Sequence, residues 1–304
     1  APDLYTNFDS GIDSFDNLTN VTTPTFTGSG LANDVVTVIL KEGSTTLAAV
    51  SVSNGSYAIP PTSRLSDGVH TLTVIAIDNA GNESIASPSI DVTIDTTPPA
   101  SITGGVDLAS SSDTGISDTD NNTNDNTLTF LGTGLIAGNL VGVYDSSTQV
   151  GQVQVGQDGS YSITTSALSD GVHSITLRQI DRADNWSTAT AVLSVTIDTQ
   201  APTAPSAAPD LDASSDTGAS STDNITNDNT PTFVGAGLAN DVATVTLKEA
   251  STVLGTASVS NGTYSITTSS ALSDGTHVVY IVATDLAGNT SSSSSLISIT
   301  IDAS

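Results

Sequence analysis

The sequence of 304 residues contains no cysteine, so no disulfide can cross-link the chain and no thiol can act as a nucleophile. Basic residues are scarce: five lysines and arginines stand against 32 acidic residues, and the net charge is −27. This charge excludes nucleic acid and anionic membrane surfaces as direct partners. The chain also has no apolar run as long as a membrane span and no recognisable signal peptide, so we expect no membrane insertion.

The acidic residues are almost all aspartates, 29 against three glutamates. They gather in three polar stretches, which we call the acidic loops: residues 8–20, 112–125 and 215–228. Like charges at this density repel one another, and so polar a segment has little to bury. The loops are therefore either solvated and mobile, or they surround a positive charge.

The acidic loops belong to a longer repeat with periods of 104 and 103 residues. The motif LSDG recurs at Asp67, Asp170 and Asp274, a D-x-A-x-N motif begins at Asp78, Asp181 and Asp285, and each unit closes on T-I-D. A repeat of this size predicts a tandem array of whole domains. We place the domains at residues 1–97, 98–200 and 201–304. Because the chain begins and ends in the repeat register, we expect it to be a segment of a longer array.

Strand and turn signals follow each other about every ten residues, and no segment has a sustained helical period. Residues 35–40 read VVTVIL, and the dipeptide Asn54-Gly55 predicts a tight hairpin turn before a strand that begins at Tyr57. In the strand after LSDG, His70 and Leu72 should face one side, with Val69 and Thr71 on the other. The sequence thus predicts an all-β fold: three tandem immunoglobulin-like β-sandwich domains in an elongated rod.

The topology of such a sandwich puts the acidic loop of one domain at the pole that faces the D-x-A-x-N loop of the next. Clusters of oxygen donors without histidine or cysteine favour a hard cation, and Ca²⁺ accepts six to eight oxygens with flexible geometry. We therefore predict Ca²⁺ as the cofactor. The predicted ligands are, in chain order, Asp9, Asp16, Asp95, Asp113, Asp118, Asp120, Asp181, Asn185, Asp198, Asp216, Asp223, Asp285, Asn289 and Asp302.

Other repeated polar residues have two interpretations each. The LSDG aspartates at 67, 170 and 274 are suited to a turn or to metal ligation. Those at 3, 107 and 210 are ligands or simply begin a strand. The three histidines at 70, 173 and 277 are better explained as hydrogen-bonded structural residues than as ligands or bases.

The motifs T-P-T-F-T-G, LSDGVHTLTV and IDNAGN, together with the acidic loops, resemble the bacterial immunoglobulin-like repeats of giant adhesins secreted by the type I route. The resemblance covers the whole chain, although Asp184 replaces the usual glycine of the D-x-A-G-N motif. It implies a rod of many domains at the bacterial cell surface, with Ca²⁺ at the domain junctions.

We therefore expect a secreted, non-catalytic and monomeric spacer in an adhesin. Its partners would be the neighbouring domains of the same chain and, through the full-length protein, glycans of host cells. The alternative is a carbohydrate-binding module, for which the best candidate is Trp186, the only tryptophan; packing at a domain junction is the other explanation of that residue. An enzyme is disfavoured, because the carboxylates recur on equivalent loops without a unique catalytic partner.

Overall fold

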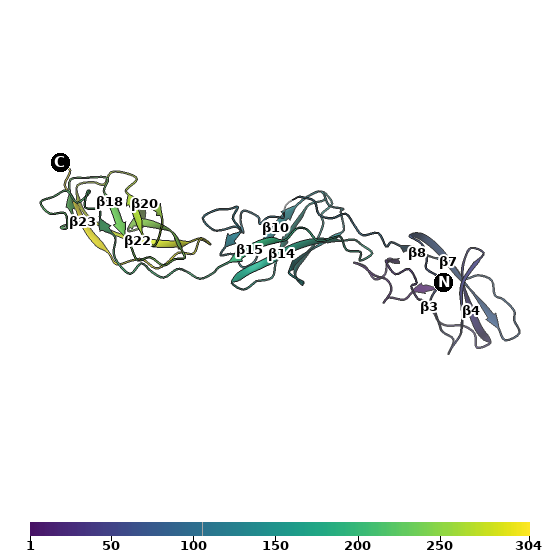
Figure 1. Ribbon diagram of the computed structural model, residues 1–304. Helices are drawn as coiled ribbons and strands as arrows, with labels where there is room; N and C mark the ends of the chain where they lie inside the picture. The colour runs from purple at the N-terminus through teal and green to yellow at the C-terminus, as the bar shows by residue number, and fades with distance from the viewer. Residues whose placement is uncertain (105) are drawn as a thin grey trace. The chain divides into compact units, whose positions relative to one another are not determined.

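The computed structural model describes residues 1–104 and 106–304, and every regular element in these residues is a β-strand (Figure 1). This confirms the all-β expectation. The chain divides into two compact units. The first consists of Ala1–Val106, Leu131–Ile163 and Thr176–Ala191, and the second of Asp107–Phe130, Thr164–Ile175 and Val192–Ser304. In the described residues, no helix is long and apolar enough to cross a membrane.

The first repeat has eight strands, two of them only two residues long. They are β1 (Asp3–Leu4), β2 (Leu18–Thr19), β3 (Phe26–Gly28), β4 (Val35–Glu42), β5 (Thr45–Ser51), β6 (Tyr57–Ile59), β7 (Gly68–Asp78) and β8 (Ile90–Ile94). They form one sheet in the order β1-β3-β6 and another in the order β2-β8-β7-β4-β5.

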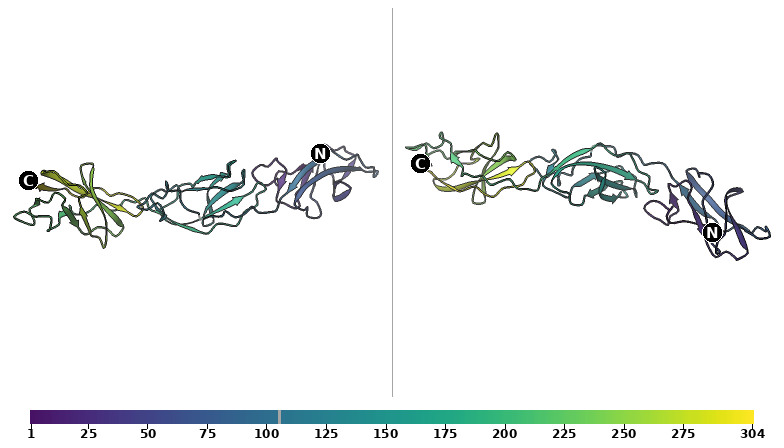
Figure 2. Two further views of the ribbon diagram at one scale, coloured as in Figure 1. Left: turned by 90° about the horizontal axis from the view of Figure 1, so that it is seen from above. Right: turned by 60° about the horizontal axis from the view of Figure 1, so that its bottom comes forward.

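The third repeat repeats this plan within the second unit. Its strands are β16 (Asp210–Leu211), β17 (Ile225–Thr226), β18 (Thr232–Gly235), β19 (Val242–Glu249), β20 (Thr252–Ser258), β21 (Tyr264–Thr267), β22 (Gly275–Asp285) and β23 (Ile297–Ile301). The sheet orders are β16-β18-β21 and β17-β23-β22-β19-β20 (Figure 2).

The middle repeat contributes strands to both units. They are β9 (Asn122–Thr123), β10 (Thr129–Gly132), β11 (Leu140–Asp145), β12 (Thr148–Gln154), β13 (Tyr161–Thr164), β14 (Gly171–Ile180) and β15 (Leu193–Ile197). In the first unit β11 pairs with β12, and in the second β14 pairs with β15, which pairs with β9.

Alternation along the strands fills the core as expected. In β7, His70 and Leu72 are buried whereas Val69 and Thr71 are exposed. The core of the first repeat is built from the buried faces of both its sheets, including Phe26 of β3. Such apolar burial is the main stabilising contribution in a domain without disulfides.

A short parallel strand fixes each acidic loop at the end of the last strand of its repeat. In the first repeat, β2 follows the loop and pairs in parallel with β8, and the Asp95 N–H donates to the Thr19 carbonyl at 2.9 Å. The same arrangement recurs with β9 and β15 and with β17 and β23. The expectation that the acidic loop lies at the pole where the last strand ends is confirmed.

The predicted hairpin at Asn54-Gly55 is wrong in one respect. Both residues have positive φ, 52° and 68°, so the tight turn itself forms. The strands on either side, however, belong to different sheets, since β5 pairs with β4 and β6 with β3. Only the isolated bridge between Ser53 and Ser56 closes the turn. The dipeptide thus specifies a local bend, while the core decides which sheet receives the next strand.

Candidate metal-binding loops and domain junctions

Each acidic loop is organised around one buried aspartate and one asparagine eight residues later. We call these the loop pairs: Asp9–Asn17, Asp113–Asn121 and Asp216–Asn224. The aspartates are only 6%, 3% and 4% exposed. In every pair the asparagine N–H donates to the aspartate Oδ2, at 3.3, 3.1 and 3.3 Å. The asparagines have φ between 58° and 61°, a left-handed conformation that asparagine tolerates better than most residues.

The second carboxylate oxygen of each pair, Oδ1, is buried and has no hydrogen-bond partner among the described residues. The side-chain oxygens of Asn121 and Asn224 are in the same condition. These atoms can only accept, and a buried charged oxygen without a partner is costly. A donor set of carboxylate and amide oxygens that lacks its positive partner fits a hard cation such as Ca²⁺.

The pKa values point to the same deficit of positive charge. Burial raises the pKa of Asp9 above its ordinary value, and the neighbouring carboxylate of Asp16 raises it further, against the lowering effect of the Asn17 N–H bond. Burial likewise raises the pKa of Asp113, with smaller contributions in the same direction from Asp120 and other carboxylates. Protein groups alone therefore do not compensate the charge at these positions.

The aspartates that directly precede the loop asparagines have a local role as well. Asp16, Asp120 and Asp223 accept the N–H two residues ahead through Oδ1, at 3.1, 3.0 and 3.2 Å. This is the Asx-turn geometry that short polar side chains favour. In each case the bond occupies Oδ1, which leaves Oδ2 of Asp120 and Asp223 available to a cation, whereas Asp16 Oδ2 contacts Arg182.

The LSDG aspartates have a structural role. Asp67 Oδ1 accepts the Thr96 N–H and hydroxyl at 3.2 and 2.8 Å, and Asp170 does the same for Thr199. Asp274 accepts the Ala303 N–H at 2.9 Å. The turn interpretation explains these residues, because they tie the corner to the segment that follows the last strand. Asp3 and Asp210 are the first residues of β1 and β16, and Asp107 lies beside the bridge residue Leu108.

In the first unit, the D-x-A-x-N loop of the middle repeat contacts the acidic loop of the first. The Asn185 side-chain amide donates to the Asp95 carbonyl at 2.8 Å and to Asp181 Oδ2 at 3.0 Å. Ser10 Oγ donates to the Ala183 carbonyl at 2.8 Å. The segments carrying Asp9, Asp16, Asp95, Asp181 and Asn185 therefore meet as the sequence predicted, but Asp95 takes part through its backbone.

The second unit contains the equivalent junction. The Asn289 side-chain amide donates to the Asp198 carbonyl at 2.7 Å and to Asp285 Oδ2 at 3.0 Å. The Ile116 N–H donates to the Leu286 carbonyl at 3.2 Å. Glycines permit this approach of two backbones: a Cβ on Gly288, whose φ is 90°, would lie 2.7 Å from the Thr114 carbonyl oxygen.

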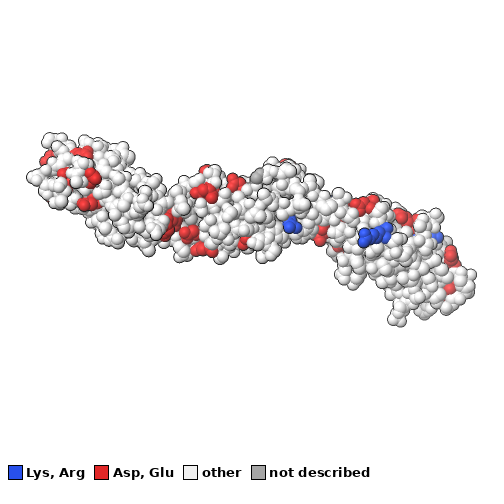
Figure 3. Space-filling view, viewed as in Figure 1, with Lys and Arg blue, Asp and Glu red and all other residues white. Residues whose placement is uncertain are grey.

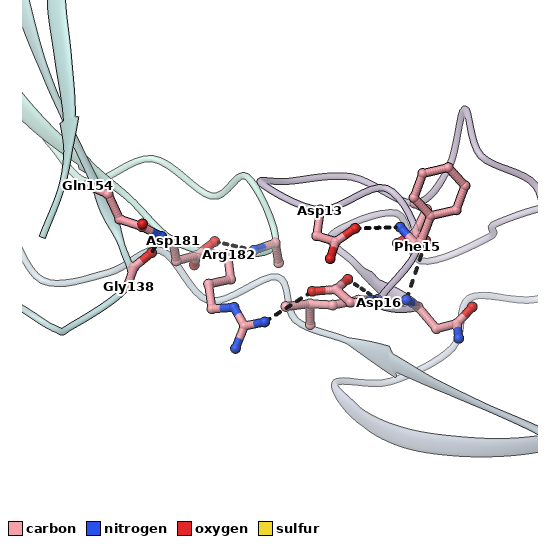
Figure 4. Close-up of polar contacts among 11 residues, drawn as sticks. Asp13, Phe15, Asp16, Gly138, Gln154, Asp181 and Arg182 are labelled. Atoms are coloured by element: carbon pink, nitrogen blue, oxygen red, sulfur yellow. Dashed lines mark hydrogen bonds and ion pairs between the residues drawn. The ribbon is translucent and has the colours of Figure 1, made fainter. Parts of the chain in front are cut away.

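The two junctions differ in their charge. At the first, Arg182 reaches Asp16 Oδ2 at 3.3 Å (Figure 4). At the second, Leu286 occupies the corresponding position, and the chain has no lysine or arginine between residues 183 and 247 or after 248. A hollow of about 140 Å³ there is lined by three aspartates, Asp198, Asp241 and Asp285. The second junction therefore has carboxylates without the basic side chain that the first one has.

Carboxylates recur along the face drawn in Figure 3, and basic side chains are few. Among the described residues, however, no three histidine, cysteine, aspartate or glutamate side chains come close enough to form a metal centre. The candidate sites instead combine one or two carboxylates with amide and carbonyl oxygens. Two predicted ligands remain: Asp118 lies near Asp113 in the same acidic loop, and Asp302 follows β23.

Sequence reasoning missed the asparagine partners in the loop pairs, which are absent from the predicted ligands. The signal was available, because Asp-Asn recurs at residues 16–17 and 223–224 and as Asp-Asn-Asn at 120–122. An asparagine at a fixed place in a polar loop is typical of a left-handed backbone position, which directs its amide inward.

The histidines are structural, as expected. His277 Nδ1 lies 3.0 Å from Glu249 Oε1, and Nε2 lies 2.9 Å from the Ser273 carbonyl. His70 has the same partners, Glu42 and the Ser66 carbonyl, at 2.8 and 2.7 Å. Burial alone would lower the pKa of His277, but the bonds to Ser273 and Glu249 outweigh it, so the pKa is raised.

The raised pKa of His277 predicts a pH-dependent stability. A histidine whose folded pKa exceeds its unfolded value contributes stability that is complete below about pH 6.5 and is lost as pH rises through the folded pKa. We expect the free energy of unfolding of the third repeat to fall by about 1–2 kcal/mol between pH 6 and pH 9, the scale of a charged hydrogen bond. Urea unfolding at both values checks this, and Glu249→Gln should flatten the difference. An equal pH slope in wild type and Glu249→Gln would contradict the assignment.

Trp186 packs within its own repeat. Its ring centroid lies 5.8 Å from that of Tyr144 at an interplanar angle of 47°, and its indole N–H donates to Asp184 Oδ1 at 3.1 Å. Trp186 as a whole remains 41% exposed. The ring contact and the hydrogen bond of this side chain thus lie within the middle repeat.

The comparisons with known proteins identify a family. A model described as bacterial Ig-like domain matches the chain three times, over residues 1–96, 100–199 and 203–303. No curated protein matches the chain.

Solved structures show weaker likenesses. The FN1–FN3 domains of chicken CNTN1 share 12% identity over 92% of this chain and 95% of that one, with a TM-score of 0.41. A tetra-tandem repeat from the extending region of a large adhesion protein shares 24% identity over 95% and 73%, with a TM-score of 0.25. The BSP domain of a biofilm-associated protein shares 13% identity over 98% and 69%, with a TM-score of 0.23. All three scores lie below 0.5, and nothing further follows from them.

Proposed function

The chain belongs to the bacterial Ig-like domain family, and from that premise we propose that it is a non-catalytic spacer segment of a bacterial surface adhesin that Ca²⁺ stiffens. The observation that carries the proposal is the set of buried, partnerless Oδ1 atoms of Asp9, Asp113 and Asp216. The acidic loops also resemble repeats of SiiE, the giant non-fimbrial adhesin of Salmonella, which agrees with a role in adhesion to host cells.

The acidic loops would hold the ion through the loop pairs. The chain's own residues supply a buried, partnerless carboxylate oxygen in each loop, joined in the second and third loops by the amide oxygens of Asn121 and Asn224. The Oδ2 atoms of Asp120 and Asp223 lie in the same two loops, whereas Asp16 Oδ2 already contacts Arg182. When bound, Ca²⁺ neutralises the carboxylates and satisfies their remaining lone pairs. Binding to a site that exists only in the folded loop adds its free energy to folding.

Stiffening follows from where the loops lie. The same loops that carry the loop pairs also contact the next repeat, through Ser10 in the first unit and Ile116 in the second. Each partly exposed hydrogen bond across a junction contributes only about 1 kcal/mol to its stability. An ordered, neutralised loop keeps these donors and acceptors in place, so a junction that is loose without the ion becomes fixed with it. Millimolar extracellular calcium is the range in which weak extracellular modules of this kind saturate.

Small-angle X-ray scattering of the chain in millimolar Ca²⁺ and in excess EGTA tests the proposal. We expect a narrower and longer distance distribution with Ca²⁺, because fixed junctions reduce the number of conformations. The matched control is the triple variant Asp9→Asn, Asp113→Asn and Asp216→Asn, whose two profiles should coincide. Superimposable wild-type profiles would refute stiffening by calcium.

A further inference from the structure

The middle repeat carries an exposed aromatic site that its two neighbours lack. At the position of Trp186, which bridges to Ile180, the other repeats have Glu83 and Thr290. Where Tyr144 follows the bulge of β11, the strands β4 and β19 have lysine. The sheet scaffold is shared by all three repeats, so the fold itself does not require these aromatic residues.

The surrounding substitutions hold the indole in one orientation. Gly142 lies where β4 has Ile39 and β19 has Thr246. A Cβ on Gly142 would lie 2.9 Å from the Tyr144 ring. The glycine therefore provides the space in which the tyrosine ring lies, and Trp186 packs on that ring. The other two repeats have different residues at the positions of Gly142, Tyr144 and Trp186.

Asp184 fixes the other side of the indole. It replaces the glycine found at residues 81 and 288, and it keeps their left-handed conformation with a φ of 71°. An aspartate is strained there, and such strain is characteristic of functional positions. What it supplies is the carboxylate that accepts the indole N–H at 3.1 Å.

Polar groups surround the aromatic pair. Gln152 of β12 is exposed and pairs directly with Gly142, and Arg178 of β14 is near enough to act on the titration of Tyr144. Tyr144 is only 8% exposed, and its buried hydroxyl has no hydrogen-bond partner among the described residues. An indole face and amide and guanidinium donors thus occur on one side of one repeat, beside the buried Tyr144.

We propose that this side of the middle repeat, centred on Trp186, is a saccharide-binding site. Aromatic faces stack on the apolar C–H face of a sugar ring, and the polar groups beside them bond to its hydroxyls. Gln152 and Arg178 provide donors on the same sheet as Tyr144. The site adds recognition to a segment whose proposed role is otherwise mechanical.

The sole tryptophan makes the test specific, because its emission reports this site alone. The intact chain in millimolar Ca²⁺ is titrated with lactose, chitotriose, cellotetraose and 3′-sialyllactose, after a glycan array has been used to add its strongest binder to the set. We expect a saturable change of the indole emission with at least one saccharide. A preference for the sialylated probe would assign Arg178 to its carboxylate, and a response to neutral probes alone would assign the site to neutral sugars.

Variants copied from the other repeats separate recognition from folding. Trp186→Thr introduces the residue of the third repeat and should weaken binding at least about tenfold by calorimetry while leaving the melting temperature of the chain nearly unchanged. Glu83→Thr makes the same exchange in the first repeat and should have no effect. The proposal is overturned if no saccharide changes the emission, or if Trp186→Thr binds as well as wild type.

Discussion

In millimolar Ca²⁺, the Asp113→Asn variant should melt below the wild type, whereas in EGTA it should melt above it. Without the ion, Asn removes a buried charge and keeps the oxygen that accepts the Asn121 N–H. With the ion, wild type gains about 2.7 kcal/mol for each site whose Kd lies a hundredfold below the calcium concentration, and the variant loses this gain at one site. For a repeat of this size the loss corresponds to roughly 10 °C or more, measurable by calorimetry.

A second aspartate of the same loop provides the control. Asp125 accepts the Ser112 hydroxyl at 2.7 Å and the Thr127 N–H at 2.9 Å, so its oxygens already have donors. Asp125→Asn should destabilise the chain equally with and without Ca²⁺. If Asp113→Asn shows the same parallel loss, the partnerless oxygen is not a metal ligand.

Replacing Asn185 should loosen the first junction without unfolding either repeat. Its amide links the Asp95 carbonyl to the Asp181 carboxylate, so Asn185→Ala removes a bond that crosses the junction. The loss of about 1 kcal/mol corresponds to a roughly fivefold larger open population. We expect a similar increase in the rate of proteolytic cleavage within the linker, residues 96–100, in Ca²⁺.

The first repeat contains the matched control for this variant. Asn82 occupies the equivalent place and its amide donates to Asp78 Oδ2 at 2.8 Å, but the structure gives it no bond to another repeat within the described residues. Asn82→Ala should therefore leave linker cleavage unchanged. Equal cleavage of both variants would show that the loop, and not the contact across the junction, sets the accessibility of the linker.

The strands could be predicted because local pattern and global packing agree in them. The alternation of His70 and Leu72 with exposed neighbours identifies the buried face of β7, and the Asn54-Gly55 turn forms with both residues at positive φ. The sheet to which β6 belongs could not be predicted. A turn signal is local, whereas the choice of sheet depends on which core the residues Tyr57 and Ile59 fill.

The junctions were predictable as meetings of segments but not atom by atom. Repeat register brings the D-x-A-x-N loop to the acidic loop, as Asn185 and Asn289 show. Sequence cannot tell that Asp95 and Asp198 contribute carbonyl oxygens, since every residue has one. Nor could it distinguish the buried Asp113 from the exposed Asp118, because burial within a polar loop depends on how the backbone folds over each side chain.

Calcium titration calorimetry of the metal-free wild type beside Asp113→Asn tests the central claim most directly, namely that the partnerless oxygens of the acidic loops bind Ca²⁺. We expect saturable binding by the wild type, with the variant losing the sites of one loop and keeping those of the loops around Asp9 and Asp216. Binding of equal stoichiometry and affinity in both proteins, or no binding by the wild type, would contradict it.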